Sequence, residues 1–235
     1  MVLLLSLGWA HKPTFATDCG SADSACIVGD PEVSIVVYQP VTCDVDQLWL
    51  TYYAPAGFEL YAQLGVPVID RLEDYRPSMA VIHPGLPQAD QPLPFDVPDG
   101  MGVLVFEGGE PESFYEPFTQ TESWVVAEET IELPEEGLGY VVAWDPEGWT
   151  GKLWLATGTV EDFSDVDLSE FGEWSEQVND FHETGEYSEP PDITEQACEQ
   201  DEEEPLEESA GCGPGLPAHA ALALAALALS RRRRS

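Results

Sequence analysis

The sequence predicts an all-β fold: an antiparallel β-sandwich of about eight strands with one C-terminal amphipathic helix. Two observations predict it. Short runs rich in β-branched and aromatic residues follow one another through the middle of the chain, separated by Pro, Gly and Asp residues that favour turns. These runs do not alternate with helical segments, so a parallel sheet with helices on its faces is not expected.

The expected strands are bounded by turn signals such as Pro55-Ala56-Gly57 and Asp145-Pro146-Glu147-Gly148. One connection is long: residues 84–102 contain five prolines, and we expect a surface crossover there. Surface loops on rigid sandwiches are common places for binding residues. The strands are expected at residues 33–41, 47–54, 58–69, 78–84, 102–108, 122–134, 138–146 and 151–160.

A single helix is expected after the last strand. Asp167 can accept hydrogen bonds as the N-cap, and Glu170 follows three residues later, as in a capping box. The apolar residues then fall on one face, which predicts a helix that packs over the sandwich edge. These residues are Leu168, Phe171, Trp174, Val178 and Phe181.

The charge of the chain is strongly negative. The sequence has 45 Asp and Glu residues against eight Lys and Arg residues, for a formal net charge of -37. Four of the basic residues close the chain, which leaves Lys12, Arg71, Arg76 and Lys152 for the rest. Such a surface repels phosphate backbones, so we expect no nucleic-acid partner. It suits an extracellular face exposed to solvent.

The N-terminal residues 1–10 indicate export. They are apolar and end in the small-x-small sequence Gly8-Trp9-Ala10, as at a signal-peptide cleavage site. No basic residue precedes the apolar run, so we expect that some residues upstream of Met1 are missing. Cleavage after Ala10 would make His11 the first residue of the mature chain, and cleavage after Ala16 is the alternative.

The C-terminal residues 210–235 form a distinctive tail. Gly211, Cys212 and Gly213 precede an uncharged stretch at residues 214–230, which is close to the lower length limit for a transmembrane helix. Arg231, Arg232, Arg233 and Arg234 follow, and the positive-inside rule would keep them cytoplasmic with the acidic body outside. The tail is either a lasting membrane anchor or a segment that is removed and replaced.

This combination of Gly-Cys-Gly, a short apolar helix and a terminal arginine cluster resembles the MYXO-CTERM type of sorting signal found in myxobacteria and related bacteria. The resemblance covers about the last 26 residues. It implies export, processing by a sorting protease near Cys212 and attachment to the cell surface, and it implies nothing about the body of the protein.

The chain therefore divides into four parts. Residues 1–10 are the expected signal peptide, and residues 11–185 are the expected sandwich domain. Residues 186–209 are rich in Glu and Pro and almost free of large apolar side chains, which predicts a disordered stalk. Residues 210–235 are the sorting or transmembrane tail.

Five cysteines occur and none forms a C-x-x-C pair, so a zinc or thioredoxin-like site is not indicated. In an exported protein disulfides are expected, and Cys212 is the one we set aside because it lies in the tail. The other four allow three pairings. Cys19 and Cys26 are the closest in sequence, and Cys43 with Cys198 would then complete the set.

No nucleophile elbow, P-loop, H-E-x-x-H or dinucleotide motif occurs. A mature N-terminal His11 would offer an amine and an imidazole to copper, which favours such nitrogen ligands. His83 and His182 are the possible partners, and His83 is preferred because it ends a strand beside the proline-rich segment. This arrangement of copper ligands resembles that of lytic polysaccharide monooxygenases and copper-resistance proteins. No further sequence motif of those families is present.

Two other candidate sites carry simpler alternatives. Trp149, in a turn, could stack on a sugar ring or could equally cover the end of the sandwich, whereas Trp124, Trp144 and Trp154 are expected in the core. Asp162, Asp165 and Asp167 could offer oxygen ligands to calcium, but their spacing is not that of an EF-hand, and a turn followed by a helix cap explains them better.

The sequence thus predicts an exported, cell-surface-tethered interaction or structural module with an unknown extracellular ligand and no demonstrable enzyme activity. One alternative is a copper-binding protein or oxidative enzyme built on His11. The other is a carbohydrate-binding module.

Overall fold

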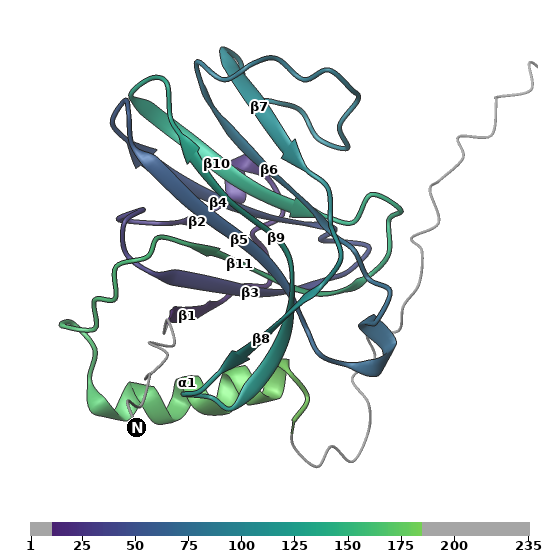
Figure 1. Cartoon of the computed structure of the whole chain (residues 1–235), viewed down its shortest axis with the longest axis vertical. Coiled ribbons are helices and arrows are strands. Elements are labelled where there is room, and N and C mark those ends of the chain that lie inside the picture. Colours follow the sequence, from purple (N-terminus) through teal and green to yellow (C-terminus); the bar gives the residue numbers. More distant parts are fainter. Residues whose placement is uncertain (1–10, 185–235) are drawn as a thin grey trace, which may run out of the picture. The chain divides into compact units, whose positions relative to one another are not determined.

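The computed structural model describes residues 11–184, which form two β-sheets and one α-helix (Figure 1). The predicted fold class, mostly β with a single helix, is confirmed. The strands in this range are β1 (Lys12–Phe15), β2 (Cys26–Ile27), β3 (Ile35–Val41), β4 (Gln47–Ala54), β5 (Glu59–Pro67), β6 (Ser78–Pro84), β7 (Met101–Phe106), β8 (Glu112–Glu116), β9 (Thr121–Glu132), β10 (Gly137–Trp144) and β11 (Gly151–Thr157). Two short 3-10 helices, η1 (Ala22–Ser24) and η2 (Asp70–Leu72), and the helix α1 (Leu168–Phe181) complete the described elements.

The strands form a six-stranded sheet in the order β1-β3-β11-β5-β9-β8 and a five-stranded sheet in the order β2-β4-β10-β6-β7. Two edge pairs, β1 with β3 and β2 with β4, are parallel, unlike the wholly antiparallel arrangement that the sequence predicts. The chain passes from one sheet to the other at each step from β1 to β4, so strands two apart in sequence become neighbours with the same direction. The three strands that the sequence analysis missed, β1, β2 and β8, have five residues or fewer.

The main core lies between the two sheets. It contains fully buried side chains from both, such as Leu64 and Leu155 of one sheet and Leu50 and Val81 of the other. The central strands are also covered on their outer faces: every residue of β11 is buried. A strand buried on both faces has no need of polar residues at alternate positions, which explains why these segments are nearly continuous apolar runs in the sequence.

The outer face of the five-stranded sheet is covered by the Pro-rich loop (residues 85–100). Phe95 of this loop packs edge-on against Trp49 and Trp144, with ring centroids 5.2 and 5.1 Å apart. The expectation of a crossover is wrong, because β6 and β7 on either side of the loop are antiparallel neighbours. The loop is the long connection of a hairpin, and it folds back over the sheet.

The outer face of the six-stranded sheet is partly covered by α1, and Figure 1 shows the helix along the side of this sheet near β1 and β8. The predicted capping box is confirmed: Asp167 accepts the backbone N–H of Ser169 at 2.9 Å, and Glu170 accepts that of Asp167 at 3.2 Å. Val178 and Phe181 pack on the face of the sheet rather than over its edge.

Ion pairs attach the C-terminal part of the domain to the rest. Glu183 accepts two hydrogen bonds from the guanidinium group of Arg71, at 2.7 and 2.6 Å, and lies 2.8 Å from the ammonium group of Lys152. Lys12 pairs with Asp165 at 2.7 Å. Three of the four basic residues in the described range therefore hold residues 161–184 in place.

A disulfide joins Cys19 to Cys26, as one of the expected pairings predicts. The pairing of Cys43 with Cys198 includes a residue outside the described range and stays a prediction. The expected signal peptide, stalk and sorting tail also lie outside residues 11–184. Within that range, no helix is both long and apolar enough to cross a membrane.

Candidate functional site

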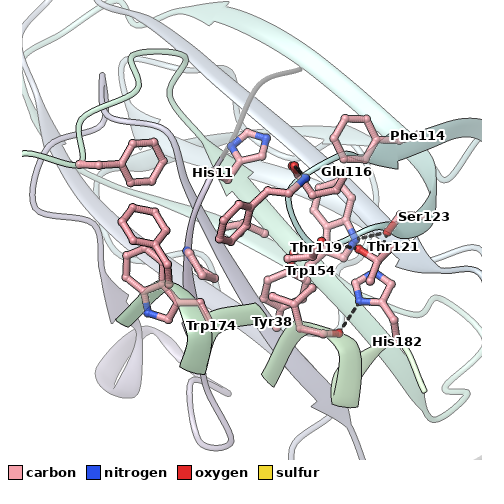
Figure 2. A pocket seen from close by; sticks show the side chains of 16 residues that line it. His11, Tyr38, Phe114, Glu116, Thr119, Thr121, Ser123, Trp154, Trp174 and His182 are labelled. Carbon is pink, nitrogen blue, oxygen red and sulfur yellow. Dashed lines mark hydrogen bonds between the residues drawn. The ribbon is translucent and has the colours of Figure 1, made fainter. Parts of the chain in front are cut away.

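A cavity of about 90 Å³ lies between α1 and the outer face of the six-stranded sheet, and we call it the helix cavity. Its lining comes from β1, β3, β8, β9, β11, α1 and the segments beside them. Figure 2 shows that aromatic rings from both the sheet and the helix surround it. The aromatic lining residues are Tyr38, Phe114, Phe118, Trp154, Phe163, Phe171 and Trp174.

The position of Trp154 depends on a glycine in the neighbouring strand. Gly65 of β5 pairs with Trp154 of β11, and a Cβ atom at residue 65 would lie only 2.0 Å from the indole ring. Any side chain there would displace the ring, because atoms in a packed interior have no room to move aside. The absence of a side chain at Gly65 therefore lets Trp154 lie on the sheet and form one wall of the cavity.

A chain of hydrogen bonds runs through one end of the cavity. Trp154 donates its indole N–H to the hydroxyl oxygen of Ser123 at 3.1 Å, and that hydroxyl lies 3.0 Å from Nε2 of His182. Nδ1 of His182 lies 2.8 Å from the carbonyl oxygen of Val178. A carbonyl only accepts, so Nδ1 carries the proton, Nε2 accepts, and Ser123 donates. Every group in this chain is satisfied with a neutral imidazole.

The pKa of His182 agrees with this assignment. Burial lowers it to about 4, the hydrogen bond to Val178 opposes that shift, and Lys152 lowers the pKa further. A serine hydroxyl bonded to a histidine can act as a nucleophile with its base. Here the histidine is a weak base, and the hydroxyl oxygen already accepts the indole N–H. In this structure the Ser123–His182 pair forms a fixed polar floor of the cavity.

Two further polar residues, His11 and Glu116, line the cavity. Nδ1 of His11 is 2.5 Å from the hydroxyl oxygen of Ser34, and burial lowers the pKa of the imidazole to about 4, with Glu161 opposing the shift. Burial also raises the pKa of Glu116, which accepts the backbone N–H of Phe118 at 2.9 Å. Figure 2 shows both His11 and Glu116 among the side chains around the cavity.

The charge of the site restricts what it can bind. Glu116 is acidic and both lining histidines are neutral at physiological pH, and no Lys or Arg is among the lining residues in the described range. An anion would meet a carboxylate with no cation to offset it. The cavity is suited to an uncharged apolar group, with hydrogen-bonding groups at its ends.

The structure does not place His83 with His11 in this cavity. His83 is fully buried in β6, where Nε2 donates to the carbonyl oxygen of Glu135 at 2.9 Å and Nδ1 lies 3.4 Å from the hydroxyl of Tyr52. The histidine that shares the cavity with His11 is His182, the partner that the sequence analysis ranked second. Within residues 11–184, no three His, Cys, Asp or Glu side chains form a group that could hold a metal ion. Copper binding through a processed His11 stays a prediction.

The three aspartates considered for calcium each have a structural partner. Asp162 accepts the backbone N–H of Ser164 at 2.9 Å, Asp165 pairs with Lys12, and Asp167 caps α1. The simpler interpretation, a turn followed by a helix cap, describes these contacts.

Trp149 lies in a different hollow, the Trp149 cleft, formed by residues 70–76 and 145–150 with a volume of about 500 Å³. Its side chain is 40% exposed, whereas Trp144 and Trp154 are buried as expected and Trp124 packs against the main core.

The anchoring residues Gly211, Cys212, Gly213 and Arg231–Arg234 lie outside the described range.

A search against protein-family models found no match for this chain, and a search of curated proteins found no relative. The function is therefore inferred from the geometry and chemistry of these two hollows.

Proposed function

We propose that this protein is an exported, cell-surface-tethered interaction module, and that the helix cavity receives an apolar group of its ligand. The observation that carries this proposal is a partly enclosed, aromatic-lined cavity with a satisfied polar floor. Aromatic walls with a few fixed hydrogen-bonding groups are typical of ligand pockets. The export half of the proposal is supported by the N-terminal apolar run and by the C-terminal tail.

The size of the cavity indicates what enters it. At about 90 Å³ the cavity is smaller than the roughly 150 Å³ of an apolar cavity that encloses benzene, so an aromatic ring enters it only in part. A whole sugar or nucleotide does not fit, but a short aliphatic group or the edge of an aromatic ring does. A single apolar side chain inserted in a pocket is a common anchor in protein interfaces. We infer that the ligand is a larger molecule that presents such a group.

The net charge of the chain indicates the rest of the ligand. With a formal net charge of -37, the protein repels acidic molecules and attracts basic ones, so the parts of the ligand outside the cavity are neutral or basic. Electrostatic attraction of this kind mainly speeds association and weakens as salt is added.

The cavity can be tested with small probes on the folded protein. Phenol and toluene should bind, and nuclear magnetic resonance should show shifts of the indole N–H signals of Trp154 and Trp174. Val178→Phe fills the cavity and should abolish these shifts, whereas Val178→Ala enlarges it and should keep or strengthen binding. Trp149→Ala, which changes the other hollow, is the control and should bind both probes normally. Binding unaffected by Val178→Phe, or no binding to the parent and the Val178→Ala variant, would overturn the proposal.

Surface attachment is tested in the native host. Deletion of Arg231–Arg234 should impair retention in the membrane, and Cys212→Ser should release the folded body or leave an unprocessed precursor. If both variants were displayed like the parent, the tail would not be a sorting signal.

A further inference from the structure

The Trp149 cleft has the features of a second binding site, and none of its lining residues lines the helix cavity. It lies between the segment that contains η2, residues 70–76, and the turn that joins β10 to β11, residues 145–150. Its volume of about 500 Å³ lies within the range of ordinary small-molecule pockets, roughly 300–1,000 Å³.

The aromatic group in this cleft is held in a fixed position. Asp145 accepts the backbone N–H groups of Glu147 and Trp149 at 2.9 and 3.0 Å, and Gly148 between them has a φ of +75°, which favours glycine. The indole N–H of Trp149 donates to the carboxylate of Glu147 at 3.1 Å. The turn is thus closed by its own hydrogen bonds, and the exposed indole is oriented before any ligand arrives. Little conformational entropy is lost when a ligand stacks on it.

The opposite wall carries an oriented cation. Nη1 of Arg76 donates to the backbone carbonyl oxygens of Glu73 and Tyr75, at 2.7 and 3.0 Å. Among the residues that the structure describes, Arg76 is the one basic residue without an ion pair. The guanidinium group has five N–H donors, so donors remain for a ligand after these two bonds.

Tyr75 borders the cleft but is only 6% exposed, and its hydroxyl is enclosed among protein atoms. The groups available to a ligand are therefore Trp149, Arg76 and the carboxylates that line the cleft.

We propose that the Trp149 cleft binds an uncharged saccharide, with a pyranose ring stacked on Trp149 and its hydroxyl groups bonded to Arg76 and the carboxylates around it. Sugar rings present an apolar C–H face and a rim of hydroxyls that both donate and accept. Five carboxylates and two guanidinium groups line the cleft, so acceptors and donors are both at hand. The excess of carboxylates disfavours acidic sugars.

The test uses isothermal titration of the folded protein with cellohexaose, xylohexaose and mannohexaose, and with hexagalacturonate as the acidic counterpart. At least one neutral oligosaccharide should bind with a dissociation constant in the micromolar to millimolar range, and hexagalacturonate should not. Trp149→Ala should weaken binding at least about tenfold, whereas Trp149→Phe should retain most of it because a ring remains. Arg76→Gln should weaken binding without changing the choice of sugar.

Several outcomes would overturn the proposal: no binding of any neutral oligosaccharide, preference for hexagalacturonate, or equal affinity in Trp149→Ala. The Val178→Phe variant separates the two sites, because it should keep saccharide binding while it loses phenol. Failure of one site therefore leaves the result for the other intact.

Discussion

The two sheets are covered on their outer faces in different ways. The Pro-rich loop (residues 85–100) covers the five-stranded sheet mainly by apolar packing: Phe95 lies against Trp49 and Trp144, and Leu93 and Val97 pack on the same cluster. α1 covers the six-stranded sheet through a few apolar contacts, and ion pairs hold its C-terminal end in place through Glu183. The Pro-rich loop packs closely on its sheet, whereas a cavity remains between α1 and the other sheet.

The two ways of covering a sheet differ in whether they leave room for a binding site. Close packing by a loop fills the space above a sheet, and rings in edge-to-face contact leave no room for a ligand. The helix α1 contacts the sheet through Val178 and Phe181 and is held next to them by the ion pairs of Glu183, and the cavity lies beside these contacts.

Loss of the ion pairs of Glu183 should lower the free energy of unfolding more than any other change considered below. Glu183→Gln removes the carboxylate that pairs with Lys152 and Arg71, and Lys152 is buried apart from 7% of its side chain. Removing one partner of a buried pair costs about 3–5 kcal/mol, so urea unfolding at neutral pH should show a loss of that size. Asp165→Asn at the exposed Lys12 pair is the matched control and should cost less than about 1 kcal/mol. Equal losses would show that the Glu183 network does not hold the helix.

The next prediction compares the packing of one phenylalanine of the Pro-rich loop with that of one phenylalanine of α1. Phe95→Ala removes a ring packed against two tryptophans and should lower the free energy of unfolding by about 3 kcal/mol, the low end for such changes because the ring is partly exposed. Phe171→Ala on α1 should cost less, because part of that ring faces the helix cavity, although Phe118, Phe163 and Trp174 pack against the rest of it. Urea unfolding measures both, and a larger loss for Phe171→Ala would contradict the comparison.

The smallest effect is a pH dependence confined to the helix side. Burial lowers the pKa of His182 to about 4, whereas the unfolded chain binds a proton near 6.5. The unfolded state therefore holds more protons between these values, and the free energy of unfolding falls as the pH is lowered through this window. Between pH 7 and pH 5 the loss from His182 is about 2 kcal/mol.

His182→Gln isolates this contribution. The variant is less stable than the parent at pH 7, and the gap should narrow by about 2 kcal/mol at pH 5 because the variant has no imidazole to protonate. The Pro-rich loop contains no histidine, so Phe95→Ala should show the same gap to the parent at both pH values. A constant gap for His182→Gln would mean that its imidazole titrates normally in the folded protein.

The sequence predicts the long central strands well because their burial on both faces gives uninterrupted apolar runs, as in Leu153 to Ala156. The helix is predicted because Asp167 and Glu170 are local signals. The edge strands β1 and β2 carry no such signal, since their partners come from distant segments. The helix cavity is not predictable for the same reason: His11, Ser123 and His182 lie far apart in the chain, and only the folded sheet brings them to one cavity. Trp149, in contrast, follows a recognisable turn signal that allows either an exposed ring or one that covers the end of the sandwich, and the structure leaves 40% of it exposed.

The pairing of β1 with β3 has a consequence for maturation. If residues 1–10 are a signal peptide, as the sequence predicts, cleavage after Ala10 leaves β1 intact, with Phe15 stacked on Tyr38 at 5.2 Å. Cleavage after Ala16 would remove the strand and leave β3 as an edge with unpaired backbone groups. An exposed edge of this kind recruits a strand from another molecule. The cleavage site would then decide whether the domain keeps both sheet edges as they are or exposes β3 to strand pairing with another molecule.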